Sequence, residues 1–150
     1  MTTKHPDYAK LAARIAISNL HKNTEKSFSK TIDIMYHYVD PKSGERASLI
    51  ADDVYQIIVK NSEELDSAIV YDRDYEYDYF GMKAMISQKY LLRDGKKTTI
   101  ERPQYMLMRV ALQTHANEWT RDTPNFAVIE KTYDYLSRKL YIHGTPTLFN

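Results

Sequence analysis

The stretch ERPQYMLMRVALQTH, residues 101–115, decides the fold of this chain. After Pro103 most positions carry apolar or long flexible side chains, and a helix that is apolar around most of its circumference is a buried helix. Proline suits the first turn of a helix, because its missing N–H would have no partner there. The apolar residues leave only Arg109, Gln113 and Thr114 for a solvent-exposed side. The stretch therefore predicts a buried central helix from Pro103 to His115.

Helical spacing of apolar residues also occurs on both sides of this stretch. Asp7, Ser62 or Asn61, and Asp78 are suitable N-cap residues, because their side chains accept hydrogen bonds from free backbone N–H groups. The sequence predicts helices at about 7–22, 29–39, 48–60, 62–68, 78–88 and 126–140. We therefore expect an all-α domain in which about six helices pack round the central helix.

A small β-hairpin is expected near Asp94-Gly95, just before the central helix. The segments 90–92 and 98–100 flank this dipeptide, and Asp-Gly supplies the positive φ angles that two-residue hairpin turns need. Earlier in the chain, the run DPKSGE, residues 40–45, lacks periodicity and contains Pro, Ser and Gly. Such a run is typical of an exposed loop.

The stretch IVYDRDYEYDYFG, residues 69–81, has the most unusual composition in the chain. Its tyrosines alternate with charged residues, which would suit a short strand, but aspartate is a poor strand residue. We expect an extended loop whose rings fill gaps between the helices. An aromatic surface for binding or electron transfer is the alternative that the residues leave open.

Length and composition limit the possible functions. With 150 residues, 43% of them hydrophobic and 27% charged, the chain is long enough for one domain with a sizeable core. A net charge of +1 gives no strong attraction to nucleic acid, and no apolar run approaches the ~20 residues needed to cross a bilayer. The N-terminus has no apolar signal-peptide core. We expect a cytoplasmic protein that binds neither nucleic acid nor membrane.

Residue chemistry alone indicates no catalytic centre. The chain has no cysteine, and its five histidines never lie three or four positions apart, so no metal site is predicted. Asp66, Asp72 and Asp74 are expected to pair with charges rather than to act as acid and base. Arg102 and Arg109 are expected to tie the central helix to neighbouring carboxylates.

Four strings together resemble a known family. HPDYAKLAARIAISNLHK, IVYDRDYEYDYFG, ERPQYMLMRVAL and HGTPTLFN occur in the order and spacing of the N-terminal helical region of the large, catalytic subunit of class I ribonucleotide reductase, in its eukaryotic-like form. The resemblance implies an enzyme that reduces ribonucleoside diphosphates to deoxyribonucleotides by radical chemistry in an α/β barrel. It implies a helical domain over residues 1–143 and the start of the barrel at 144–150, where TLFN also has the pattern of a strand.

The resemblance also suggests two site residues. Thr145 matches a hydroxyl residue that contacts the substrate diphosphate, and Lys22 matches a basic residue that helps bind the regulatory nucleotides ATP and dATP. By its position alone, Lys22 is equally a cation that complements the dipole at the end of a helix. No cofactor is expected on this segment, and the family's catalytic cysteines, absent here, lie beyond residue 150. The chain by itself is therefore expected to be inactive.

The implied partners are the barrel and the ATP-binding cone of the same subunit, a second large subunit in a homodimer, and a small subunit with a metal-radical cofactor. In this interpretation the chain scaffolds the barrel and links it to the cone. The alternative is a free-standing helical interaction module, or a non-catalytic fragment that keeps the helices of the reductase without its enzyme activity.

Overall fold

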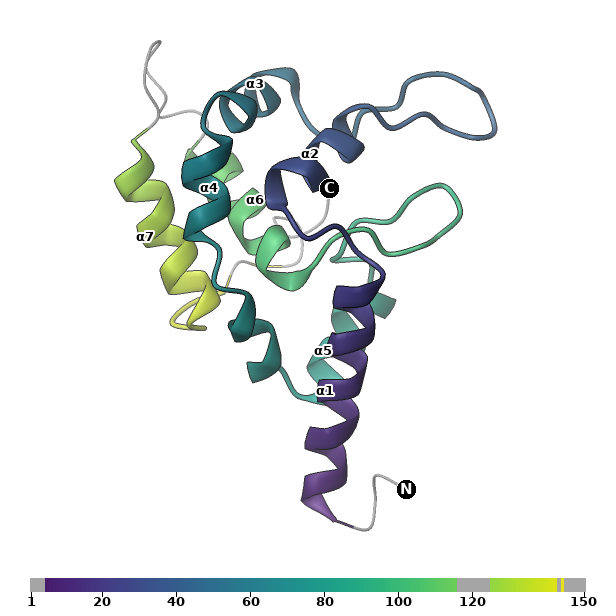
Figure 1. The fold of residues 1–150 in the computed structure, drawn as a ribbon, viewed down its shortest axis with the longest axis vertical. Helices are drawn as coiled ribbons and strands as arrows, with labels where there is room; N and C mark the ends of the chain where they lie inside the picture. The colour runs from purple at the N-terminus through teal and green to yellow at the C-terminus, as the bar shows by residue number, and fades with distance from the viewer. Residues whose placement is uncertain (1–4, 116–124, 143, 145–150) are drawn as a thin grey trace.

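The computed structural model describes residues 5–115, 125–142 and 144, and Figure 1 shows an assembly of helices without a sheet. The described helices are α1 (Pro6–Lys22), α2 (Phe28–Tyr36), α3 (Asp52–Lys60), α4 (Ser62–Ala68), the 3-10 helix η1 (Tyr71–Glu76), α5 (Tyr79–Ser87), α6 (Pro103–His115) and α7 (Phe126–Ser137). The all-α prediction is confirmed. The expected strand at 147–150 lies outside the described residues.

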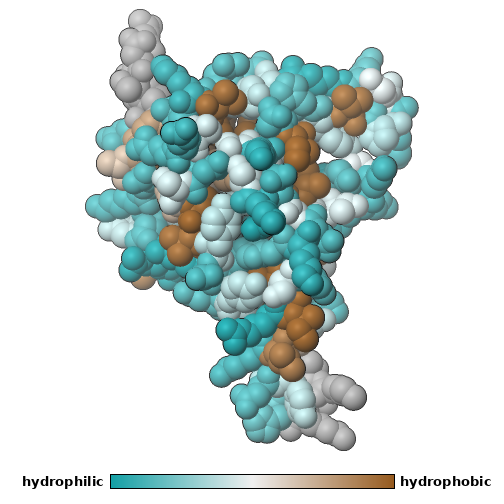
Figure 2. Space-filling view, in the orientation of Figure 1, coloured by the Kyte–Doolittle hydropathy of each residue, from teal (hydrophilic) through white to brown (hydrophobic). Residues whose placement is uncertain are grey.

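Helix α6 is the buried centre of the domain, as the sequence predicts. Every residue from Pro103 to Leu112 is buried, and α6 packs most extensively against α7. The other contacts are peripheral pairs, in which α1 lies along α5 and α2 lies against α3 and α4. In Figure 1 the N-terminal half of α1 extends beyond this body, and Figure 2 shows apolar side chains exposed along this helix. The apolar interior therefore has one principal axis, the α6 helix.

The assignment of Arg109 to a solvent-exposed side was wrong. Arg109 and Glu101 are both 0% exposed, and Arg109 Nε donates to Glu101 Oε1 at 2.8 Å. Arg109 Nη2 donates to Glu101 Oε2 at 3.2 Å, and the same oxygen accepts from the Leu92 backbone N–H at 3.0 Å. A buried guanidinium is tolerated when a carboxylate binds it through two parallel hydrogen bonds. The arginine therefore belongs to the core, and its expected carboxylate partner is Glu101.

Several helix ends differ from the predicted ones because local hydrogen bonds compete with the helix. Helix α1 begins one residue early, since the His5 side chain, rather than Asp7, accepts the capping bond. Helix α3 begins only at Asp52, because the Ser48 hydroxyl bonds to the backbone of Ile50 and holds this segment outside the helix. The Asp78 cap of α5 is confirmed, with its carboxylate accepting from the Gly81 N–H.

The hairpin near Asp94-Gly95 is reduced to a loop with a single antiparallel bridge, between Arg93 and Thr99. The positive φ lies at Lys97 instead of Gly95, and the Asp94 carboxylate accepts from the Thr98 N–H at 2.8 Å. Gly95 is needed for another reason: an added Cβ would collide with Tyr38 and Pro41 of the preceding loop. Figure 1 shows these two long loops projecting from the same side of the domain.

The Glu101–Arg109 pair makes a stability prediction. Glu101→Ala leaves the Arg109 guanidinium buried without its counter-ion, which costs about 3–5 kcal/mol. For a chain of this length the midpoint of thermal unfolding should fall by about 10 °C or more. Circular dichroism at increasing temperature measures this. Glu45→Ala, at an exposed loop position, is the control and should leave the midpoint almost unchanged. Equal midpoints for the two variants would show that the buried pair is not needed.

Candidate functional site

The predicted effector residue Lys22 lies beside a basic hollow at the C-terminal end of α1. Lys22 is the last residue of α1 and is exposed. The hollow has a volume of about 360 Å³ and is lined by His21, Lys22, Lys26, Tyr71 and Arg102. Four of these side chains carry nitrogen and the fifth is an aromatic ring. Such a set suits an anion with a flat ring system, which uses both charge and stacking.

Arg102 forms the floor of this hollow. The residue is only 5% exposed, and its Nε donates to Thr24 Oγ1 at 2.8 Å. Its Nη2 donates to the backbone carbonyls of His21 and Thr24, at 3.0 and 3.3 Å. The expectation that Arg102 binds a carboxylate was wrong. The last carbonyls of a helix have no partner within the helix, and Arg102 supplies donors for the end of α1.

Two tyrosines fix the chain segment that follows α1. The Tyr71 hydroxyl donates to the Lys26 carbonyl and the Tyr105 hydroxyl to the Glu25 carbonyl, both at 3.0 Å. The Arg102 guanidinium lies 5.7 and 5.5 Å from the centres of these two rings. Burial raises the pKa of Tyr105, so this hydroxyl stays a donor at any physiological pH. The backbone around Lys22 is therefore held to the start of α6.

A buried carboxylate joins α1, η1 and α6 next to this hollow. Asp74 in η1 is 0% exposed, and its Oδ2 lies 2.7 Å from His21 Nε2 in α1. Its Oδ1 accepts from the Gln104 N–H at 3.2 Å, in the first turn of α6. A carboxylate is stabilised there by the free N–H groups of a helix N-terminus. Asp74 thus ties α1, η1 and α6 together through a histidine and a backbone N–H group.

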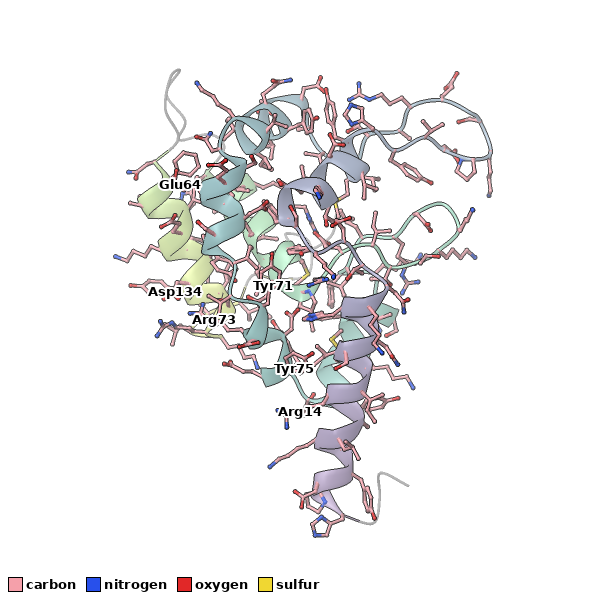
Figure 3. The ribbon with its side chains drawn as sticks, viewed as in Figure 1. Arg14, Glu64, Tyr71, Arg73, Tyr75 and Asp134 are labelled. Atoms are coloured by element: carbon pink, nitrogen blue, oxygen red, sulfur yellow. The ribbon has the colours of Figure 1, made fainter. Side chains whose placement is uncertain are left out.

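The tyrosine-rich stretch contains the 3-10 helix η1 and the start of α5 instead of the extended loop that the sequence predicts. Figure 3 shows Arg73 directed toward Asp134 of α7, and the two side chains form an ion pair at 2.9 Å. On the other side, the Tyr75 hydroxyl lies 3.2 Å from the Ser18 hydroxyl of α1. Tyr71 and Tyr77 pack against the core. These contacts agree with the packing role, and the electron-transfer alternative stays a hypothesis.

Two other candidate residues are Asp66, which has a structural role, and Thr145. Asp66 accepts from the Ser29 N–H at 2.8 Å and binds the Ser27 hydroxyl, so it steadies the start of α2. Thr145 lies outside the described residues. Within residues 5–115, 125–142 and 144, no three His, Asp or Glu side chains gather as they would to hold a metal ion. No helix in this part of the chain is long and apolar enough to cross a membrane.

Sequence reasoning proposed Lys22 as a site residue but did not identify the residues that surround it. Lys26 follows Lys22 after four positions and was detectable as part of a basic cluster. Tyr71 and Arg102 come from distant parts of the chain, and no local pattern links them to the end of α1. Only the packing of η1 and α6 against α1 brings them together.

Comparison with known proteins places this helical domain in a defined class. The sequence model of the family described as "Ribonucleotide reductase, all-alpha domain" matches residues 75–150. The chain is 52% identical over 150 residues to the ribonucleoside-diphosphate reductase large subunit of Arabidopsis thaliana, and 52% identical over 151 residues to the large chain of Schizosaccharomyces pombe. It is 48% identical over 150 residues to the large subunit of Caenorhabditis elegans.

These matches cover the whole of this chain but only 17% of the Arabidopsis and S. pombe proteins and 18% of the C. elegans protein. The matched part is the N-terminal region of those large subunits. The chain belongs to the ribonucleotide reductase family and corresponds to the all-α domain of its large subunit. The resemblance found in the sequence is confirmed.

Buried tyrosines give the domain a predictable response to alkaline pH. Burial raises the pKa of Tyr77 and of Tyr133 to about 12, while an unfolded chain titrates near 10. Because deprotonation favours the unfolded state, this contribution to stability is complete below pH 10. It is lost as the pH rises from 10 through about 12. Absorbance titration near 295 nm should show tyrosines that ionise late in the native chain.

Two variants test the assignment of the late-ionising tyrosines. Tyr133→Phe should remove one of them, whereas Tyr8→Phe, at a position that is 51% exposed, should leave the late-ionising tyrosines in place. A native titration curve that coincides with that of the unfolded chain would contradict the burial argument.

Proposed function

We propose that this chain forms the N-terminal helical part of a ribonucleoside-diphosphate reductase large subunit, an enzyme that supplies deoxyribonucleotides for DNA synthesis in the cytoplasm. The observation that carries the proposal is identity of about half the residues along the whole chain with named large subunits of this enzyme. The helical domain would occupy residues 1–143 and the barrel would begin at 144–150. The domain would scaffold the barrel and connect it to the nucleotide-binding cone.

The chain would act as one part of an assembly. The catalytic cysteines would come from the barrel, since this chain has none. The expected partners are the rest of the large subunit, a second large subunit and the small subunit with its metal-radical cofactor. ATP and dATP would bind as effectors of the complete subunit, and this segment would hold no cofactor of its own.

A chimeric enzyme tests the proposal directly. In the Arabidopsis large subunit, the 150 residues that match are replaced by this chain, and reduction of CDP is measured with the Arabidopsis small subunit. An active, dATP-sensitive chimera would establish the role. A chimera that is folded but inactive would contradict it and would favour the alternative of a free-standing helical interaction module.

Lys22 is proposed to bind the phosphates of the effector. Its place at the rim of the basic hollow, next to Lys26 and Arg102, supports this role over that of a simple helix-end cation. In the chimera, Lys22→Gln removes one charged donor to phosphate, and such hydrogen bonds contribute about 1.5–3 kcal/mol. The dATP concentration for half-maximal inhibition should therefore rise by about tenfold or more.

The matched control for Lys22 is Lys30→Gln, at an exposed position on α2. It changes the net charge equally and should leave the dATP response unchanged. If both variants respond to dATP as the unchanged chimera does, Lys22 serves only the end of α1.

Thr145 is proposed to contact the substrate diphosphate through its hydroxyl. Thr145→Val replaces the hydroxyl by a methyl group of similar shape, so one hydrogen bond of about 0.5–1.5 kcal/mol is lost. In the chimera the KM for CDP should rise by roughly threefold to tenfold. Thr145→Ser keeps the hydroxyl and should keep the KM. An unchanged KM in the valine variant would remove Thr145 from the substrate site.

A further inference from the structure

A second hollow lies on the face formed by α5, α6 and the end of α7. It is apolar and larger than the basic hollow beside Lys22. Its volume is about 530 Å³. Charged residues contribute only Lys139 to its lining, which consists of Tyr77, Gly81, Ala84, Met85, Tyr90, Met106, Leu107, Leu136, Lys139, Tyr141, Ile142 and Gly144. We call it the apolar hollow. It lies against the first turns of the buried α6 helix, so its floor is the core itself.

The chain after α7 is turned so that an apolar side chain of the lining stands exposed. Ile142, which lines the hollow, is 78% exposed. Leu140 N–H donates to the Tyr135 carbonyl at 3.0 Å, and Lys139 has a φ of +60°, which together end α7 in a left-handed turn. Lysine is an uncommon residue at such a position, because its side chain disfavours positive φ. The turn is therefore held in place by other contacts.

The Lys139 side chain itself makes the contacts that hold this turn, and the same contacts bind its ammonium group. Lys139 Nζ donates to the Glu76 carbonyl at 2.8 Å and lies 4.4 Å from the centre of the Tyr77 ring. The one cation in the lining is thus already bound to groups of this domain. What remains for an occupant is an apolar surface with little charge, which excludes a phosphate or carboxylate ligand and suits aliphatic or aromatic side chains.

Most of each relative lies outside the region that this chain matches, and Tyr141, Ile142 and Gly144 line the apolar hollow. A large apolar surface is rarely left exposed to water in a complete, folded protein. We propose that the apolar hollow receives an uncharged, apolar segment of the polypeptide that follows residue 150 in the longer large subunits. This proposal rests on the proposed function, because it needs a chain that continues as in those subunits.

The experiment compares Ile142→Glu with Val59→Glu, in the isolated chain and in the Arabidopsis chimera. Ile142 lines the apolar hollow, whereas Val59 is a similar β-branched residue on α3, 50% exposed and outside it. Since both side chains are already exposed in this chain, each variant should melt within a few degrees of the unchanged isolated chain. In the chimera, only Ile142→Glu should separate the helical part from the rest.

Separation is measured by limited proteolysis and by calorimetry. The rate of proteolytic release of the helical part should rise by about tenfold or more for Ile142→Glu, as expected for losing the burial of one isoleucine. Its thermal unfolding should divide into two transitions, while the Val59→Glu chimera keeps the single transition of the unchanged chimera. Identical behaviour of the two chimeras would overturn the proposal.

Two further outcomes would overturn it in favour of another occupant. If the isolated chain forms dimers that Ile142→Glu abolishes and Val59→Glu does not, the hollow receives a second copy. If a small apolar probe such as ANS binds the unchanged chimera at this hollow as tightly as it binds the isolated chain, the hollow stays open. Failure of the proposed function is distinguished by the unchanged chimera, since its CDP reduction does not depend on either variant.

Discussion

The buried ion pair between Glu101 and Arg109 is the constraint on which the rest of the domain depends. It closes the start of α6 against its own second turn and also fixes the loop before the helix through the Leu92 N–H. Desolvating two charges is expensive, so this pair is kept only where both partners are held rigidly by packing. The domain is therefore organised around α6. The Glu101–Arg109 ion pair fixes the N-terminal end of this helix, and burial of its apolar side chains fixes the rest.

The N-terminal turn of α6 also holds together the residues around the candidate effector site. Arg102 reaches the end of α1, Gln104 binds the carboxylate of Asp74, and Tyr105 holds the chain after α1. The basic hollow beside Lys22 is consequently built on a part of the fold that several buried side chains hold by hydrogen bonds. If an effector binds there, its contacts act on the end of α1 and on the start of α6 together. This is the arrangement that a connection between two neighbouring domains requires.

The sequence predicted most of the helices and proposed one residue of the candidate site, and the misses have specific physical causes. The sequence analysis placed Arg109 on a solvent-exposed side of α6. Composition cannot show that the Glu101 carboxylate, eight residues earlier, binds its guanidinium group. The sequence analysis expected Gly95 to supply a positive φ angle for the turn. The structure instead requires glycine there because Tyr38 and Pro41 approach its backbone closely. Lys22 was proposed as a site residue, but Tyr71 and Arg102 were not grouped with it, because their nearness to it depends on the contact of α1, η1 and the start of α6.

The sequence by itself determined that the chain is helical, that residues 103–115 form its buried centre, and that it resembles a reductase large subunit. These properties follow from the spacing of apolar residues and from strings of consecutive residues, both of which are local. The tertiary structure alone decided that Arg109 and Asp74 are buried, that α1, η1 and the start of α6 share a basic hollow, and that an apolar hollow opens beside the end of α7. Each of these depends on the distance between side chains far apart in the chain, and no local pattern encodes that distance.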